Sequence, residues 1–455
     1  MPLFTRWFAD SDRAQAWRLA STILNVLALV LCALAVAGWF LAPFYVPTIA
    51  RGFTHAQAAE AVEMTRAIIP GVVTTSLAGA LSALLNAQGR FAASALQGVA
   101  INIVTIATVL IFAPHWGIGA LVFGTLIGLV AQLVVQLPAL IALRGYRPVL
   151  DLAHPGVREL LSVLGPIVLG SLGGQAGIFL DRYFASGLPV GAISGMNYAI
   201  KLVSFPQTVF TTALATVLFP LLASEFARSN KSAVRKALES SLQIVNVITI
   251  PATAGLIIIA GPLVRVLFER GAFDPHATAL TASLVPYAAV GLAAIAVNVI
   301  LSRCTYACNA VWPTVWISLA SVVLNVALAL TFLPSLGARG LLLASSLSQV
   351  AQAIALSVVV RRLIGSIGWR GVGWQTLRVS VASAVMMAVI FYVEYYAAPP
   401  GTTHAQDALF VIMALGLGGV IFVVMARALG VREVDRVAEM IRLKVSGVPK
   451  GPDLP

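Results

Sequence analysis

The 455-residue chain is 59% hydrophobic and only 10% charged, with a mean hydropathy of +0.95. Soluble domains carry about 25% charged residues because their surfaces face water, so this composition excludes a soluble fold and indicates a surface that faces lipid. The net charge of +12 does not indicate a nucleic-acid partner, because the basic residues are scattered over many connections and form no stripe.

Apolar runs long enough to cross a membrane recur along the whole chain. A spanning helix needs about 20 largely apolar residues, and helices are the default because hydrocarbon offers no partner for an open backbone amide. The sequence therefore predicts an all-α fold, a polytopic membrane bundle of about twelve transmembrane helices. The predicted spans are 19–43, 66–88, 93–113, 117–142, 159–184, 194–222, 238–260, 279–302, 314–333, 338–360, 376–397 and 407–428.

The Lys and Arg residues are distributed unevenly between the connections. When the connections are numbered alternately, most basic residues fall on the side that also holds both chain ends. Cytoplasmic loops carry an excess of Lys and Arg, so we expect both termini to be cytoplasmic and the basic side to contact anionic membrane lipids. The opposite side holds only Arg51, Arg66, Arg265, Arg270 and Arg339.

Two stretches of the chain resemble each other at a constant offset. Asn102–Gln132 and Asn325–Gln352 each contain an Asn-centred span, a Pro-x-x-Gly turn and a Val-Ala-Gln sequence. Such a repeat indicates two pseudo-symmetric halves around a central cavity, where transporters of this kind bind substrate. Pro114, Gly117, Leu121, Val130, Ala131 and Gln132 recur as Pro334, Gly337, Leu341, Val350, Ala351 and Gln352, each 220 positions later.

The repeat also bears on the start of the chain. At an offset of 218, Pro2 and Phe8 recur as Pro220 and Phe226. Because the second copy begins near Arg158, two spans before Pro220, we expect the first copy to lack its first two helices. The predicted domains are an incomplete N-terminal lobe at 1–150, a C-terminal lobe at 151–365, two additional spans at 366–430, and a cytoplasmic amphipathic helix and tail at 431–455.

Ionisable side chains within spans are candidate functional residues, because each costs several kcal/mol unless it faces a wet cavity or a partner. Lys201 lies about 10 Å inside its span at 1.5 Å per residue. There its ammonium is suited to bind an anionic group as a point charge. The alternative interpretation is a lysine whose stem extends to the outer interface.

Four more polar residues accompany Lys201. Asp181 and Arg182 are neighbours, so on a helix they point about 100° apart and do not pair with each other. Asp181 is a functional candidate or a structural partner of another helix, and Arg182 is a binding residue or an interface anchor. Gln175 and Asn197 either hydrogen-bond a bound substrate or join helices.

Asn102 and Asn325 occupy equivalent repeat positions. This equivalence favours a shared interhelical role for the two side chains.

The sequence contains no arrangement that indicates catalysis or a metal centre. The histidines are scattered in connections, and no paired carboxylates, Gly-rich phosphate loop or Ser/His arrangement stands out. Cys304 and Cys308 lie one helical turn apart without an accompanying histidine, which favours small apolar helix residues over a zinc site. We therefore expect a protein that is not an enzyme and that uses no cofactor.

Several sequence blocks occur in one order over about 350 residues. The blocks are Leu85–Phe91, Gln175 with Leu180–Ser186, Asn197–Leu202 with Pro206, Pro251–Gly255, and Leu267–Phe273. In this order they resemble the MurJ/MviN lipid II flippases of the MOP (multidrug/oligosaccharidyl-lipid/polysaccharide) exporter superfamily, from about residue 1 to about residue 365.

The resemblance implies a fourteen-helix fold, of which this chain lacks the first two helices with their cavity arginines. It also implies outward transfer of lipid II by alternating access in the bacterial inner membrane, and a role in cell-wall synthesis. The implied substrate is an undecaprenyl-diphosphate-linked peptidoglycan precursor, and cell-wall synthesis proteins are possible partners. The implied substrate-binding residues are Lys201, Asn197, Gln175, Asp181 and Arg182.

The sequence departs from the family pattern at several positions. The eighth helix usually has Asp-Arg where this chain has Ile200-Lys201. Some members bind sodium through an acid on the seventh helix and an Asn plus an Asp on the eleventh. Asp181 and Asn325 match the first two of these ligands, but Ala329 replaces the last acid.

Two other functions compete with the flippase hypothesis. One is another exporter of the same superfamily, such as a polysaccharide-lipid flippase or a multidrug exporter, for which an acidic or apolar cavity is expected. The other is a non-transporting relative that binds cell-wall proteins.

Overall fold

The computed structural model describes residues 13–50, 52–208, 218, 222, 224–226, 228, 230–308, 310–397 and 403–435, with the backbone alone described at 161–167, 169–174 and 397. Within these residues all regular secondary structure is helical. The chain divides into two compact units, 1–168 and 169–455, and the division falls inside helix α8.

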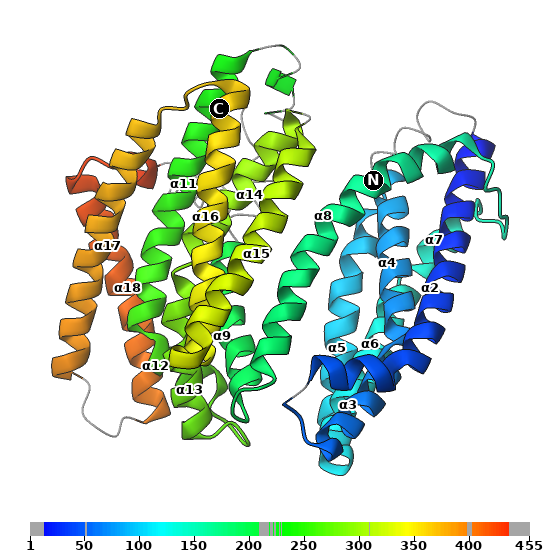
Figure 1. Ribbon diagram of the computed structural model, residues 1–455, viewed down its shortest axis with the longest axis horizontal. Coiled ribbons are helices and arrows are strands. Elements are labelled where there is room, and N and C mark those ends of the chain that lie inside the picture. Colours follow the sequence, from blue (N-terminus) through cyan, green and yellow to red (C-terminus); the bar gives the residue numbers. More distant parts are fainter. Residues whose placement is uncertain are drawn as a thin grey trace. The chain divides into compact units, whose positions relative to one another are not determined.

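The first unit is built on long antiparallel helices (Figure 1). Helix α2 packs against α3 and α4, and α6 packs against α5 and α4. Their shared core contains Trp17, Leu24, Leu81, Leu84 and Leu85. The helices are α2 (Arg13–Ile49), α3 (His55–Ile68), α4 (Pro70–Ala87), α5 (Phe91–Trp116), α6 (Ile118–Val134), α7 (Leu137–Leu143) and the start of α8 (Pro155–Ala185).

The second unit repeats this antiparallel arrangement and adds a pair of helices at its end (Figure 1). Helix α11 packs against α14 and α17, α15 against α16, α13 against α9, and α17 against α18. The helices that follow α8 are α9 (Ala192–Pro206), α11 (Lys231–Ile258), α12 (Ala260–Phe268), α13 (Pro275–Ala289), α14 (Leu292–Ala307), α15 (Val311–Leu336), α16 (Ala338–Ile364), α17 (Trp369–Ala397) and α18 (His404–Ala428).

The two stretches that resemble each other in sequence have nearly the same backbone. We call α5, α6 and α7 the first hairpin, and α15 and α16 the second hairpin. Gly117 ends α5 with φ 51° and ψ −129°, and Gly337 ends α15 with φ 56° and ψ −131°. A positive φ suits glycine, so the Pro-x-x-Gly sequence specifies the same turn twice.

Nine helical segments of the described residues are long and apolar enough to cross a membrane, or ten if the bent pair α13 and α14 is one span. These ten correspond to ten of the predicted spans. The predicted spans 159–184 and 194–222 include residues whose backbone or side chains are not described, so the total of about twelve stays a prediction.

The structure corrects three predicted spans. The helix expected at 279–302 is bent by 43° between α13 and α14. The span expected at 66–88 follows a capped helix that already begins at His55, because Thr54 forms a capping box with Gln57. The span expected at 19–43 runs from Arg13 to Ile49, since Pro43 and Pro47 lie inside the helix without ending it.

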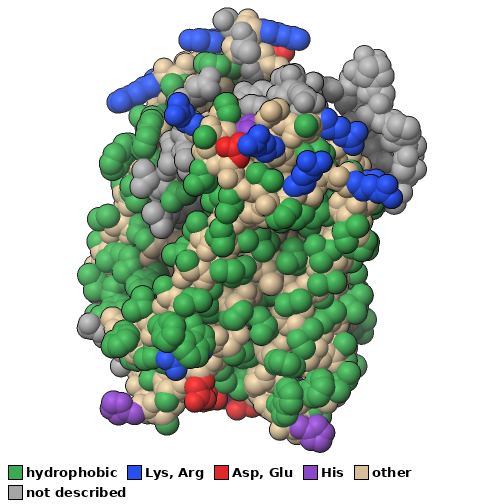
Figure 2. Space-filling view, turned by 90° about the vertical axis from the view of Figure 1, so that its right-hand side faces the viewer, with side chains coloured by type: hydrophobic (Ala, Val, Ile, Leu, Met, Phe, Trp, Pro, Cys, Tyr) green, Lys and Arg blue, Asp and Glu red, His purple; other side chains and the backbone are tan. Residues whose placement is uncertain are grey.

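The surface of the first unit has the distribution expected of a membrane protein. Its large apolar side chains are exposed along α5, where Leu110 is 73% exposed. Figure 2 shows hydrophobic side chains over the middle, most of the Lys and Arg side chains near one end, and acidic and His side chains near both ends. An apolar band between polar ends suits a bilayer.

The cytoplasmic amphipathic helix and tail expected at 431–455 are described only as far as Asp435. Val431 and Val434 are buried in a core that also contains Val379 and Phe422. This part of the segment therefore packs on α17 and α18 and does not lie on lipid, and the rest lies outside the described residues.

Candidate substrate-binding site

Helix α8 contacts α15 through one of its faces. The Asn325 amide donates a hydrogen bond to the Asp181 carboxylate over 3.1 Å. One turn earlier, a methyl group added at Gly177 would lie 3.7 Å from Val322 Cγ2. The pair Asp181–Asn325 therefore joins two helices, and a methyl group at Gly177 would make only an ordinary van der Waals contact with α15.

A second face of α8 is directed toward α9. The Arg182 guanidinium donates a hydrogen bond to the Asn197 side-chain oxygen. Consecutive helical residues point about 100° apart, which explains why Asp181 and Arg182 reach different helices and do not pair. Arg182 is half-buried and hydrogen-bonded to Asn197. Such a contact is not expected of a side chain that only anchors its helix at the membrane–water interface.

Lys201 lies one helical turn after Asn197 on α9. Residues four apart face the same side of a helix, so Arg182, Asn197 and Lys201 form one group, which we call the basic site. The Lys201 side chain is exposed, and its Nζ lies 5.8 Å from the centroid of the Tyr198 ring. This distance is within the range of a cation–π interaction.

The Tyr198 ring is held by two aromatic side chains from another part of the unit. Its centroid lies 4.7 Å from that of Phe268 and 5.2 Å from that of Phe273. Phe268 is the last residue of α12, and Phe273 lies between α12 and α13. The aromatic cluster thus connects α9, which carries the basic site, to the α12–α13 turn.

Gln175 is exposed and lies two helical turns before Arg182 on α8. A spacing of seven residues places both side chains on the same face, about 10 Å apart along the axis. Gln175 is therefore directed to the same side of α8 as Arg182.

The chain was compared with families of known proteins. The family described as "Lipid II flippase MurJ" matches residues 1–411. The chain belongs to this family. The match confirms the family predicted from the sequence blocks, and it confirms that the chain belongs with transporters and not with enzymes.

Curated relatives support the assignment over most of the chain. Lipid II flippase MurJ of Burkholderia cenocepacia is 29% identical over 383 residues, which cover 81% of this chain and 73% of the relative. Probable lipid II flippase MurJ of Rhizobium meliloti is 28% identical over 454 residues, which cover 92% of this chain and 83% of the relative. The chain is thus a multi-pass membrane protein of the MurJ family.

Solved structures share the fold. Lipid II flippase MurJ in an inward closed conformation has a TM-score of 0.77 at 19% identity, over 94% of this chain and 88% of that one. An inward-facing multidrug resistance MATE family transporter of the MOP superfamily has a TM-score of 0.70 at 15% identity, over 80% of this chain and 85% of that one. At such identities the likeness extends to the fold alone.

The residues that match the sodium ligands of some MurJ-family members lie together. Asp181 and Asn325 are hydrogen-bonded, and Asn325 is 7% exposed. Among the described residues, none donates a hydrogen bond to its buried Oδ1. A carboxylate and an amide oxygen suit a hard cation, but Ala329, one turn further on α15, supplies only a methyl group. The side chains of Asp181 and Asn325 therefore supply only some of the oxygen ligands that such an ion needs.

The two repeat-related asparagines differ, so the expectation of a shared interhelical role is wrong. Asn325 bonds to Asp181 on another helix, whereas Asn102 donates over 2.7 Å to the Gly98 carbonyl of its own helix. An exposed amide facing lipid finds its partner on the nearest backbone turn.

The aromatic cluster around Tyr198 was not predicted from the sequence. The spacing of Tyr198 and Lys201, three residues apart, is a helical signal for contact. No local signal pairs Tyr198 with Phe268 and Phe273, because about 70 residues separate them along the chain.

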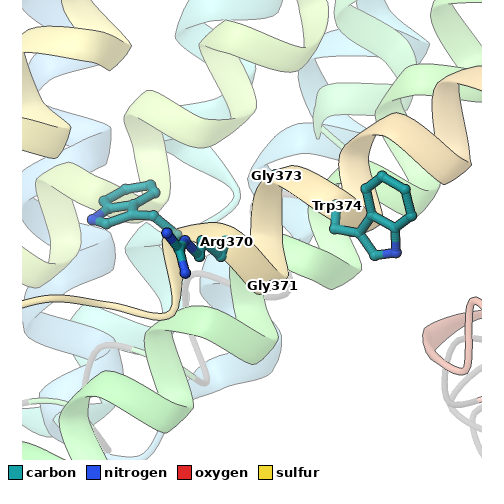
Figure 3. A pocket seen from close by; sticks show the side chains of 5 residues that line it. Arg370, Gly371, Gly373 and Trp374 are labelled. Carbon is teal, nitrogen blue, oxygen red and sulfur yellow. The ribbon is translucent and has the colours of Figure 1, made fainter.

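A shallow recess of about 650 Å³ lies at the start of α17, away from the basic site (Figure 3). It is lined by Trp369, Arg370, Gly371, Gly373 and Trp374. Trp and Arg at a helix end are typical of the membrane–water interface, so this recess marks the level of the headgroups.

Proposed function

We propose that this chain transfers lipid II across the bacterial inner membrane and that its basic site binds the diphosphate of the substrate. The observation that carries the proposal is the Arg182–Asn197 hydrogen bond between α8 and α9, with Lys201 one helical turn after Asn197, in a member of the MurJ family. Gln175 is directed to the same side and is suited to hydrogen-bond the attached sugar.

The chemistry of the basic site suits an anionic headgroup. An ionised donor forms the shorter and stronger hydrogen bonds to phosphate. Arg182 is oriented by Asn197, so less side-chain freedom is lost when its planar guanidinium binds oxygen atoms. Lys201 adds a second positive charge on a flexible side chain. Its ammonium interacts with the Tyr198 ring until a bound anion takes the place of the ring as its partner.

A groove in the same unit is suited to the lipid part of the substrate. It has a volume of about 490 Å³ and lies between α11, α14, α16 and α17. Leu242, Ile250, Val297 and Ile354 are among its lining residues, and Arg361 also lines it. Mostly apolar walls suit a hydrocarbon chain.

The repeat supports a mechanism by alternating access. The first and second hairpins have the same turn at positions 220 residues apart, as expected of a transporter with two related halves. We propose about twelve spans in two pseudo-symmetric repeats, with both termini on the cytoplasmic, Arg-rich side. The central cavity remains a prediction, as do partners among the cell-wall synthesis proteins.

We assign Asp181 and Asn325 to holding α8 against α15, with sodium binding as the alternative. Their hydrogen bond supports the first role, and the buried Asn325 Oδ1 supports the second. A sodium-dependent change in thermal stability that disappears in Asp181→Asn would favour the second role.

Growth of a strain that depends on this gene tests the proposal. Lys201→Ala is expected to lower the growth rate severely and Lys201→Arg to restore most of it, because either cation attracts the diphosphate. Lys231→Ala is the matched control, since Lys231 starts α11 outside the site, and it is expected to grow normally. Normal growth of both Lys201→Ala and an Arg182→Ala, Lys201→Ala double variant would contradict the assigned site.

A further inference from the structure

The first hairpin contains a break that the second hairpin lacks. Helix α6 ends at Val134, and α7 begins at Leu137 with Pro138 in its first turn. Proline has no backbone N–H and disrupts the helical bond to the residue four positions earlier. Helix α16 runs unbroken from Ala338 to Ile364, and the position 220 residues after Pro138 is Val358.

The side chain of Gln136 replaces a backbone hydrogen bond at this break. In a regular helix the Gln136 N–H would donate to the Gln132 carbonyl. Instead it donates to Leu133 O over 3.1 Å. The Gln136 side-chain amide donates to Gln132 O over 2.9 Å. Because an unsatisfied carbonyl within a membrane costs several kcal/mol, this contact stabilises the break.

The same amide has more acceptors than it can serve at once. Gln136 Nε2 also lies 3.3 Å from the Ala78 carbonyl on α4 and 3.3 Å from Gln97 Oε1 on α5. An amide nitrogen has two N–H donors, so these contacts form alternative sets. Gln136 is fully buried, and no described residue donates to its Oε1. The corresponding residue in the second hairpin is Leu356, which is also fully buried. Its side chain has no N–H group and cannot form alternative hydrogen bonds.

The chain after the break is fastened to α2. Arg144 adopts a left-handed conformation with φ 49°, and Gly145 follows against the Trp17 ring. A methyl group at Gly145 would lie only 2.0 Å from a carbon of that ring, so glycine is required for this close approach. Residues 145–151, which we call the strap, then run along α2.

Polar contacts hold the strap on α2. The Arg147 N–H donates to Ser21 Oγ over 3.0 Å, and the Asn25 amide donates to the Val149 carbonyl over 3.0 Å. Arg18 pairs with Asp151 over 2.8 Å. The strap thereby connects the end of α7 to the part of α2 that carries Arg18.

We propose that the α6–α7 junction is a hinge about which α7, the strap and the adjoining end of α2 move relative to α6. The proposal rests on the proposed function, since a flippase must expose its substrate on both sides in turn. Pro138 weakens the helix at one point, and Gln136 exchanges acceptors as the angle changes. Hinges of this kind absorb a change in φ and ψ over a few residues.

Hydrogen–deuterium exchange of the full chain in lipid nanodiscs tests the hinge. Amides 139–143 are expected to exchange at least tenfold faster than amides 359–363, which occupy the equivalent positions in the unbroken helix. Pro138→Ala and Pro138→Val restore a backbone N–H, and both are expected to slow exchange at 139–143. Val358→Ala is the matched control and is expected to leave exchange at 139–143 unchanged.

Transport of fluorescent lipid II in liposomes gives the functional result. If the hinge operates, Pro138→Ala lowers the rate of translocation several-fold while lipid II binding is retained. Equal exchange of 139–143 and 359–363 in the wild type would overturn the proposal, as would Pro138→Ala with slowed exchange and unchanged translocation. Absence of translocation by the wild type would refute the proposed function, while the exchange comparison would still decide the hinge.

Discussion

The first and second hairpins share a turn but differ in how their helices pack. In the first, glycines allow α5 and α6 to approach closely: a methyl group at Gly128 would lie 2.4 Å from Thr105 Oγ1 and 2.9 Å from the Ile101 carbonyl. In the second, the equivalent residue is Ser348, whose hydroxyl bonds to Ser345 O over 2.8 Å. Similar backbone turns thus carry different interfaces, so a residue's role cannot be transferred from one hairpin to the other by position alone.

The asparagines test this conclusion with the largest expected effect. Asn325→Ala removes the hydrogen-bond partner of Asp181 and is expected to lower the free energy of unfolding by about 2–3 kcal/mol. Asn102→Ala removes only an exposed bond to its own helix and is expected to cost less than about 0.5 kcal/mol. Thermal unfolding in detergent measures both, and equal costs would contradict the difference between the hairpins.

Exchanging a residue between the hairpins gives a smaller effect. Gly128→Ser introduces the second hairpin's side chain into the first and is expected to destabilise the protein by about 2 kcal/mol through overpacking. Gly79→Ala is the control, because no atom lies within 4 Å of the added methyl group, and it is expected to stabilise α4 slightly. A neutral Gly128→Ser would show that α5 and α6 separate at little cost.

The strap gives the smallest effect. The Arg18 and Asp151 side chains are 52% and 20% exposed, and partly exposed ion pairs contribute less than about 1 kcal/mol. Asp151→Asn is therefore expected to lower the unfolding temperature by no more than a few degrees, and less so at high salt. A larger loss would mean that the strap holds α2 more firmly than its ion pair indicates.

The sequence predicted the features that depend on local patterns. Long apolar runs identified ten spans that the structure contains, and the Pro-x-x-Gly sequence identified the turns at Gly117 and Gly337. The positions of helix breaks were less predictable. The bend between α13 and α14 lies inside a continuous apolar run, where hydropathy contains no signal for it.

The candidate site was predicted only in part. Lys201, Arg182 and Asp181 were predicted as candidates because charge is rare within spans. Asn197 and Asn325 were also named as candidates, but the hydrogen bond between Arg182 and Asn197 was not predicted. The contact Asp181–Asn325 joins helices that are distant in sequence, and Arg182–Asn197 joins the consecutive helices α8 and α9. In both cases helical spacing alone cannot identify which faces meet. The prediction of a shared role for Asn102 and Asn325 was wrong for the same reason, because the hydrogen bond that each side chain forms depends on the residues around it.

Translocation of lipid II by the purified chain tests the central claim most directly. Liposomes that contain fluorescent lipid II would be compared with and without the reconstituted wild-type chain, Lys201→Ala and Lys231→Ala, with an impermeant quencher reporting the leaflet. The account predicts rapid transfer by the wild type and Lys231→Ala, and at least tenfold slower transfer by Lys201→Ala. Transfer by the wild type no faster than in empty liposomes would contradict the proposed function and favour a lipid-binding protein that does not transport.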